Sequence, residues 1–229
     1  MANIFPRSSN FLPLKIAVFV AAIGATVTLG FTYYGSPKFT RVGYQPDQPV
    51  PFSHKIHAGE LGLDCRYCHS NVEQSNHSNI PSVETCMNCH ENGIKTNSPA
   101  LQPIRDAYET KNSLEWIQIH ETADYVYFDH SAHVNSGISC VSCHGRVDQM
   151  EKVYHAENHS MGWCLECHRE PEKHLRPIEQ VTNLAWTAED HPGVMIDGEL
   201  TQYSQEELGE KLKEQWKINP PVSCGGCHR

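Results

Sequence analysis

The sequence is poor in the residues that build an ordinary hydrophobic core. Hydrophobic residues make up 39% of the 229 positions, and one uncharged N-terminal stretch takes part of that share. A small core without a staple is only marginally stable. Something other than side-chain packing must therefore supply buried apolar surface. The ten cysteines and fifteen histidines indicate metal or cofactor ligation as the source.

Basic residues are also scarce. The chain has 18 Lys and Arg against 27 Asp and Glu, a net charge of −9. Residues 1–37 contribute two positive charges, Arg7 and Lys15, so the remaining residues carry −11. This balance argues against binding to nucleic acid, which selects basic surfaces. An acidic surface can steer a positively charged partner protein, and it equally serves to keep a protein soluble.

Charge is absent from the nineteen residues between Ile16 and Tyr34. At about 1.5 Å per residue, this stretch nearly crosses a hydrocarbon core about 30 Å thick. Arg7 and Lys15 precede it without an acidic neighbour, which favours a cytoplasmic N-terminus. A cleaved signal peptide is the alternative, but no Ala-x-Ala site follows the apolar run. We expect residues 1–37 to form an uncleaved membrane anchor and residues 38–229 to lie in the periplasm.

No cysteine stands alone, because all ten belong to Cys-x-x-Cys-His motifs. The five motifs are Cys65/Cys68/His69, Cys86/Cys89/His90, Cys140/Cys143/His144, Cys164/Cys167/His168 and Cys224/Cys227/His228. Three site types contain such cysteine pairs: zinc sites, redox-active dithiols and covalently attached haem c.

The motifs are arranged in an internal repeat. PFSHKIH before the first motif matches YFDHSAH before the third, so His54 and His57 stand 76 residues before His130 and His133. Each histidine pair is followed by two motifs. We therefore expect two dihaem modules, about 50–95 and 126–175, and a fifth site within 200–229.

Zinc fits the spacing of the first four motifs, because 17 and 20 residues separate the successive cysteine pairs. It leaves the fifth pair without a partner and does not explain the histidine that follows every pair. Five redox dithiols in one chain would be unusual. Haem c explains the whole pattern, since two thiols bind the porphyrin and the adjacent histidine binds the iron. We predict five haem c groups with His69, His90, His144, His168 and His228 as proximal ligands.

The second axial ligands must come from outside the motifs. The duplicated histidines His54, His57, His130 and His133 are the first four candidates, because histidines three apart on a helical turn can serve two different haems. The fifth ligand is among Met161, His120 and His159, and His155 is a further option. The expected place of His77, His174 and His191 is the surface or a helix cap.

Little regular structure is predicted around these sites. The fold expected is a multihaem cytochrome c of coil and short helices, with little or no sheet, after one transmembrane helix. Ser204 to Ile218 predicts a helix, with a capping box of Ser204 and Glu207 and one face of Leu208, Leu212 and Trp216. Ser113 to His120 predicts a second helix, and Val42 to Pro51 an extended tether.

Several longer stretches resemble one family. VGYQPDQPVPFSHKIHAGELGLDCRYCH, IPSVETCMNCH, YVYFDHSAHVNSGISCVSCHGRVDQM and SMGWCLECHRE are similar to the pentahaem cytochrome c subunit of alternative complex III. The likeness covers most of residues 40–175 and the final CGGCH. The paired histidines also resemble those of small trihaem cytochromes. That likeness implies that His54 serves the haem on His69, and His130 the haem on His144.

The resemblance implies a place in a membrane complex. Quinol-binding membrane subunits oxidise quinol, an iron–sulfur subunit lies on the periplasmic side, and haem subunits pass electrons to a cytochrome c or an attached terminal oxidase. The chain shows no identifiable quinol site and no nucleophile or acid–base constellation, so no catalytic residue is predicted. The alternatives are a multihaem reductase with one five-coordinate haem and a freestanding quinol dehydrogenase that feeds a periplasmic reductase.

Overall fold

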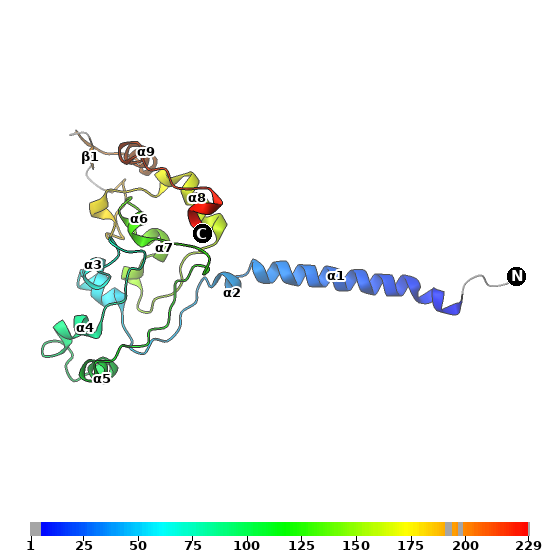
Figure 1. Ribbon diagram of the computed structural model, residues 1–229, viewed down its shortest axis with the longest axis horizontal. Helices are drawn as coiled ribbons and strands as arrows, with labels where there is room; N and C mark the ends of the chain where they lie inside the picture. The colour runs from blue at the N-terminus through cyan, green and yellow to red at the C-terminus, as the bar shows by residue number, and fades with distance from the viewer. Residues whose placement is uncertain (1–5, 191–193, 197–198, 229) are drawn as a thin grey trace. The chain divides into compact units, whose positions relative to one another are not determined.

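A computed structural model describes residues 6–190, 194–196 and 199–228. The chain divides into two compact units, Met1–Arg41 and Val42–Arg229 (Figure 1). In the first unit, the 3-10 turn η1 (Arg7–Phe11) leads into α1 (Leu12–Tyr34), and α2 (Pro37–Thr40) follows. The helical stretch Arg7–Tyr34 is long and apolar enough to cross a membrane. Helix α1 begins at Leu12, four residues before the uncharged stretch that starts at Ile16. Pro13 lies in the first turn of α1, a position where proline is well tolerated.

The second unit consists of short helices joined by irregular chain. Among its described residues the sheet is one two-stranded antiparallel hairpin, and the expected fold of short helices with little sheet is confirmed. The elements are η2 (Lys55–Glu60), α3 (Cys65–Cys68), α4 (Val83–His90), η3 (Pro99–Leu101), α5 (Gln102–Thr110), α6 (His130–Val134), α7 (Val141–His144), η4 (Val147–Gln149), α8 (Met161–Arg169), η5 (Pro171–Lys173), η6 (Ile178–Gln180), β1 (Val194–Ile196), β2 (Glu199–Thr201), α9 (Gln205–Trp216) and α10 (Cys224–Cys227).

The apolar interior of this unit is divided among three small clusters. One joins α9 to the chain around Leu175 and Trp186, and a second joins α4 to α5 around Val50 and Met87. The third consists of Val72, Val134 and Val181, with Cys140 packed against it. None of these clusters is large, which agrees with the shortage of core-forming residues in the sequence.

The helix predicted at the C-terminal side is confirmed as α9. Ser204 accepts a hydrogen bond from the Glu207 backbone N–H, and the Glu207 carboxylate accepts one from the Ser204 N–H, so the capping box is complete. Leu208 and Leu212 are buried and Trp216 packs beside them. The helix ends at Trp216, and Lys217 then takes a left-handed conformation.

The helix predicted for residues 113–120 is wrong, because this segment has no helical structure. The Gln48 side chain hydrogen-bonds both backbone groups of Ile117, donating to its carbonyl (2.8 Å) and accepting from its N–H (2.9 Å). These are the groups that a helix would use for its own ladder. Leu114 and Trp116 pack on the α4–α5 cluster from the extended chain.

The stretch predicted as a tether, residues 42–51, is extended but is part of the second unit. Gly43 N–H donates to the His155 carbonyl (2.8 Å), and His155 N–H donates to the Tyr44 carbonyl (3.0 Å). Val50 is 2% exposed. The extended segment therefore packs along residues that precede α8, and it is not a free linker.

Candidate functional site

Each of the five Cys-x-x-Cys pairs lies on one helical turn. In chain order these turns belong to α3, α4, α7, α8 and α10, and we name the five motifs sites 1 to 5. Residues three apart on a turn face the same side, so both thiols of a pair are presented together. Side chains cap two of the turns: Asp64 accepts from the Arg66 N–H before site 1, and Ser160 accepts from the Trp163 N–H before site 4.

The histidines that follow these turns are held by backbone carbonyls. In four of the five, the ring nitrogen Nδ1 is at hydrogen-bond distance from a carbonyl oxygen, which fixes the ring and leaves Nε2 to bind a metal. Burial, with His120 and His130 nearby, lowers the pKa of His144 well below its usual value. The four contacts are His69 to Asn79 (2.7 Å), His90 to Ile94 (2.7 Å), His168 to Pro221 (2.7 Å) and His228 to Tyr125 (3.1 Å).

The first histidine pair is held by a turn and an aromatic ring. His54 caps the π-helical turn η2 and His57 lies within it. The His57 Nδ1 lies 2.8 Å from the Ser53 carbonyl oxygen. Phe52 stacks on His57 with ring centres 4.3 Å apart and meets His54 edge-on at 4.8 Å.

The second pair repeats this arrangement on α6. The His133 Nδ1 lies 2.7 Å from the Asp129 carbonyl oxygen, and Phe128 stacks on His133 at 4.6 Å. Phe128 meets His130 edge-on at 4.8 Å. The internal repeat found in the sequence is therefore also a structural repeat, including the phenylalanine before each pair.

Three of the predicted distal histidines face a proximal histidine. The ring centres are 6.3 Å apart for His57 and His90, 6.4 Å for His130 and His144, and 6.1 Å for His133 and His168. Two imidazoles on opposite sides of one iron have ring centres about 6 Å apart, because each metal–nitrogen bond is about 2 Å long and the ring centre lies about 1 Å behind the nitrogen. The three separations fit a metal held between each pair.

His54 completes the set. Burial lowers the pKa of its imidazole to about 4, with His69 and then His57 as further causes, so the ring is neutral at physiological pH. Its Nδ1 is buried and has no hydrogen-bond partner among the described residues. A neutral imidazole next to His69 is the donor that a second axial position at site 1 needs.

The three histidine candidates for the fifth distal ligand, His120, His155 and His159, lie close together. The His120 ring lies 4.3 Å from that of His144, and the His159 Nε2 lies 3.3 Å from the Cys143 carbonyl oxygen. Both histidines therefore belong to the surroundings of site 3. His155, 1% exposed, stacks on His120 at 5.2 Å and lies 4.7 Å from His159.

Met161 is the remaining candidate. It begins α8, one turn before Cys164, and its side chain is 67% exposed. Burial raises the pKa of the Cys164 thiol, and Cys227 of site 5 is close enough to raise it further. Met161 thus lies on the helix that adjoins site 5. Of the other histidines, His77 is exposed and His174 half-buried, and His191 lies outside the described residues.

Sequence reasoning missed the backbone groups that orient these rings. Their carbonyls come from residues of unrelated type, such as Asn79, Ile94 and Pro221, so residue identity gives no signal. The carbonyl four residues before His57 and before His133 is the exception, because the repeat duplicates that spacing.

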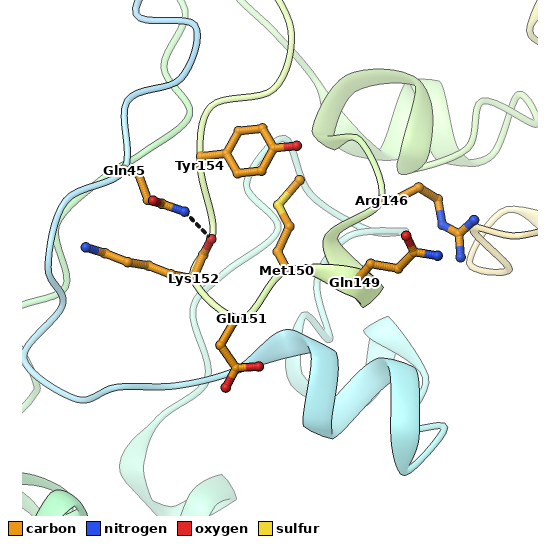
Figure 2. Close-up of a pocket in the computed structure, with 7 residues that line it drawn as sticks. All are labelled: Gln45, Arg146, Gln149, Met150, Glu151, Lys152 and Tyr154. Atoms are coloured by element: carbon orange, nitrogen blue, oxygen red, sulfur yellow. Dashed lines mark hydrogen bonds between the residues drawn. The ribbon is translucent and has the colours of Figure 1, made fainter.

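An open hollow is lined by residues that are not candidate ligands. Figure 2 shows its polar lining, in which the Gln45 side chain donates to the Lys152 carbonyl (2.7 Å). None of the lining residues is a predicted haem ligand. Among the described residues, no group of three or more His, Cys, Asp and Glu side chains is arranged to hold a bare metal ion. The hollow is lined by Gln45, Arg146, Gln149, Met150, Glu151, Lys152 and Tyr154.

Comparison with known proteins places part of this chain among cytochromes. Residues 50–109, which contain sites 1 and 2, match the family described as cytochrome c7 and related cytochrome c. The chain is also similar to the menaquinone reductase, multiheme cytochrome c subunit, of Nitratidesulfovibrio vulgaris (strain Hildenborough). The identity is 27% over 173 residues, which cover 67% of this chain and 81% of the relative. The chain therefore carries a cytochrome c7-like multihaem domain, a class that binds haem c covalently and transfers electrons.

Proposed function

We propose that this chain is the electron-transfer subunit of a membrane quinol-oxidising complex of the alternative complex III type. Five haem c groups would be attached at sites 1 to 5, on the periplasmic side of a bacterial inner membrane. The observation that carries the proposal is the set of three imidazole pairs with ring centres 6.1–6.4 Å apart, each joining a duplicated histidine to a motif histidine.

The residues at each site have separate roles in this proposal. The two cysteines would form thioether bonds, and the histidine after them would bind the iron from one side. His54, His57, His130 and His133 would bind it from the other side at sites 1, 2, 3 and 4. Bound haem c would supply reversible one-electron exchange at its iron. With both axial positions filled, these four sites have no room for a substrate at the metal, which suits electron transfer.

The membrane assignment rests on two independent observations. The helical stretch Arg7–Tyr34 has the length and hydropathy of a membrane span. The relative from Nitratidesulfovibrio vulgaris is named as a subunit of a menaquinone reductase. We infer that the partners are quinol-binding membrane subunits, an iron–sulfur subunit and a monohaem cytochrome c or terminal oxidase.

Met161 is our proposal for the distal ligand at site 5. His120 and His159 lie around site 3, whereas α8 adjoins site 5. A thioether ligand would give site 5 a higher potential than the four histidine-ligated sites. The exposed side chain at the start of the helix has no packing role that competes with ligation.

Purification of the complex in mild detergent tests the function. We expect five covalent haems per chain in a pyridine haemochrome assay, low-spin spectra, and co-purification of quinol-binding and iron–sulfur subunits. Recovery of the polypeptide alone with quinol dehydrogenase activity would favour the freestanding enzyme. A high-spin haem and substrate reduction by the isolated chain would favour the multihaem reductase.

Substitution of Met161 tests the fifth ligand. Met161→Ala should convert one of the five haems to high spin, and Met161→His should keep it low-spin while lowering its potential. His159→Ala serves as the matched control and should leave all five low-spin. Loss of one low-spin signal in His159→Ala, with none lost in Met161→Ala, would reverse the assignment.

A further inference from the structure

We propose that the five sites lie along one line in the order 2–1–3–4–5, which differs from their order in the sequence. Sites 2 and 5 are then the two ends, and site 1 lies in the interior next to site 3. The inference rests on the proposed attachment of a haem at each site, and it assigns the path that the proposed function requires.

Sites 1 and 2 are neighbours because one turn supplies both with a ligand. His57 faces His90 at 6.3 Å, and His54, the proposed ligand at site 1, stands three residues before His57. Side chains three apart on a helical turn have Cβ atoms about 5–6 Å apart, so the two metal positions must be close. The Asn88 side chain also donates to the Tyr67 hydroxyl (3.2 Å), which joins the two attachment helices.

Sites 3 and 4 are neighbours for the same reason. His130 and His133 lie on α6 and face His144 and His168, respectively.

The two modules meet at sites 1 and 3. The Cys65 thiol lies 4.0 Å from the Thr182 carbonyl oxygen, and Cys140 N–H donates to the adjoining Val181 carbonyl (3.4 Å). The first cysteines of sites 1 and 3 therefore contact two consecutive residues, Thr182 and Val181, which places the two sites side by side.

The loop after site 1 strengthens this junction. His130 Nδ1, on the helix that serves site 3, lies 2.8 Å from the Asn76 carbonyl oxygen. The Asn135 side chain donates to the Glu73 carbonyl (3.0 Å), and Ser131 N–H donates to that of Ser75 (3.2 Å). The loop that follows site 1 thus holds the helix that supplies the distal ligand of site 3.

Site 5 adjoins site 4. The Pro221 carbonyl, three residues before Cys224, holds the Nδ1 of His168 at 2.7 Å. Figure 1 shows α4 and α5 at the lower end of the second unit, well away from α8 and the C-terminus. Of the ten cysteines, Cys89 at site 2 and Cys224 at site 5 are exposed, and the other eight are half-buried. The exposure of a cysteine at each of these two sites agrees with the proposal that sites 2 and 5 are the two ends of the line.

Redox titration of histidine-to-methionine variants tests the order, because a changed potential at one site shifts the potentials of its neighbours. In the proposed order, His57→Met alters site 2 and should shift one other haem signal, whereas His54→Met alters site 1 and should shift two. An arrangement in sequence order predicts the reverse. His133→Met at site 4 is the control, because it should shift two signals in either order.

The measurement uses the full chain in its complex, with potentials followed by electron paramagnetic resonance. Fewer than five haems in the parent protein would contradict the proposed function. Five haems with two shifted signals in His57→Met and one in His54→Met would overturn the order alone.

A spin label gives a second readout that leaves every ligand in place. Glu109→Cys puts a nitroxide on an exposed position of α5, the helix packed on α4. Oxidation of site 1 should enhance its relaxation more than oxidation of site 3. Equal or reversed effects would overturn the order.

Discussion

Gly209, in the middle of α9, should not tolerate alanine. A Cβ added at this position would lie 1.8 Å from the Glu172 carbonyl oxygen and 2.5 Å from its carbon, both of them backbone atoms of η5. A Cβ contact shorter than 3.0 Å is essentially never observed, so α9 and η5 would have to separate by about 1 Å. The separation would loosen Leu208 and Leu212 and stretch the 2.7 Å ion pair between Lys213 and Glu172.

Two opposing effects decide the sign of the Gly209→Ala change. Alanine favours the helical state by about 1 kcal/mol over glycine. Overpacking against rigid backbone costs about 1–3 kcal/mol, and partial loss of burial at two leucines adds to this cost. We expect a net loss of about 1–2 kcal/mol, which for a chain of this size lowers Tm by roughly 2–8 °C.

Thermal unfolding of the haem-loaded full chain in detergent, followed by circular dichroism, checks this prediction. Glu210→Ala is the matched control, because Glu210 is the exposed neighbour on the same helix and should change Tm by less than about 2 °C. A Tm for Gly209→Ala equal to or above that of the parent would mean that helix propensity dominates. The close approach of α9 to η5 would then not limit stability.

Two further substitutions test local features. Ser204→Ala should remove the capping box of α9 and cost about 1 kcal/mol in thermal unfolding, whereas Ser113→Ala, at a position that caps no helix, should cost nothing measurable. Hydrogen bonds from Arg66 lower the pKa of Asp64 to about 2, so its stabilising effect is complete above the unfolded pKa of about 4 and is lost as the pH falls through 2. Because this pair is partly exposed, Asp64→Asn should reduce stability at pH 7 by at most about 1 kcal/mol, with the difference from the parent vanishing between pH 4 and pH 2; a constant difference over that range would contradict the role of the charge.

Local sequence signals predicted the local structure. The capping box and apolar face of α9 lie within fifteen residues, so neighbours in the sequence determine them. The duplicated histidine pairs were likewise visible as a repeat. Residues 113–120 carry a comparable local signal, but Gln48, 69 residues upstream of Ile117, takes up the backbone groups that a helix needs. A local sequence pattern cannot predict a contact between residues so far apart in the sequence.

In the candidate site, too, local features could be predicted from the sequence and contacts between distant residues could not. Spacing alone identified the motifs and the histidine pairs, but it could not show which histidine faces which. It also could not separate His120 and His159 from Met161, because their placement depends on how site 3 packs against residues 155–159. His120 and His159 stand 39 residues apart in the sequence, yet their ring centres lie 6.1 Å apart.

The carbonyls that steady the motif histidines differ in how far away they are along the chain, and this has a consequence for biogenesis. His69 and His90 rely on Asn79 and Ile94, which emerge almost immediately after them. His168 relies on Pro221, which is synthesised 53 residues later. In the proposed function, sites 1 and 2 can thus orient their motif histidines soon after these residues are synthesised, whereas site 4 must wait for Pro221. Truncations near the C-terminus should therefore damage maturation at site 4 as well as at site 5.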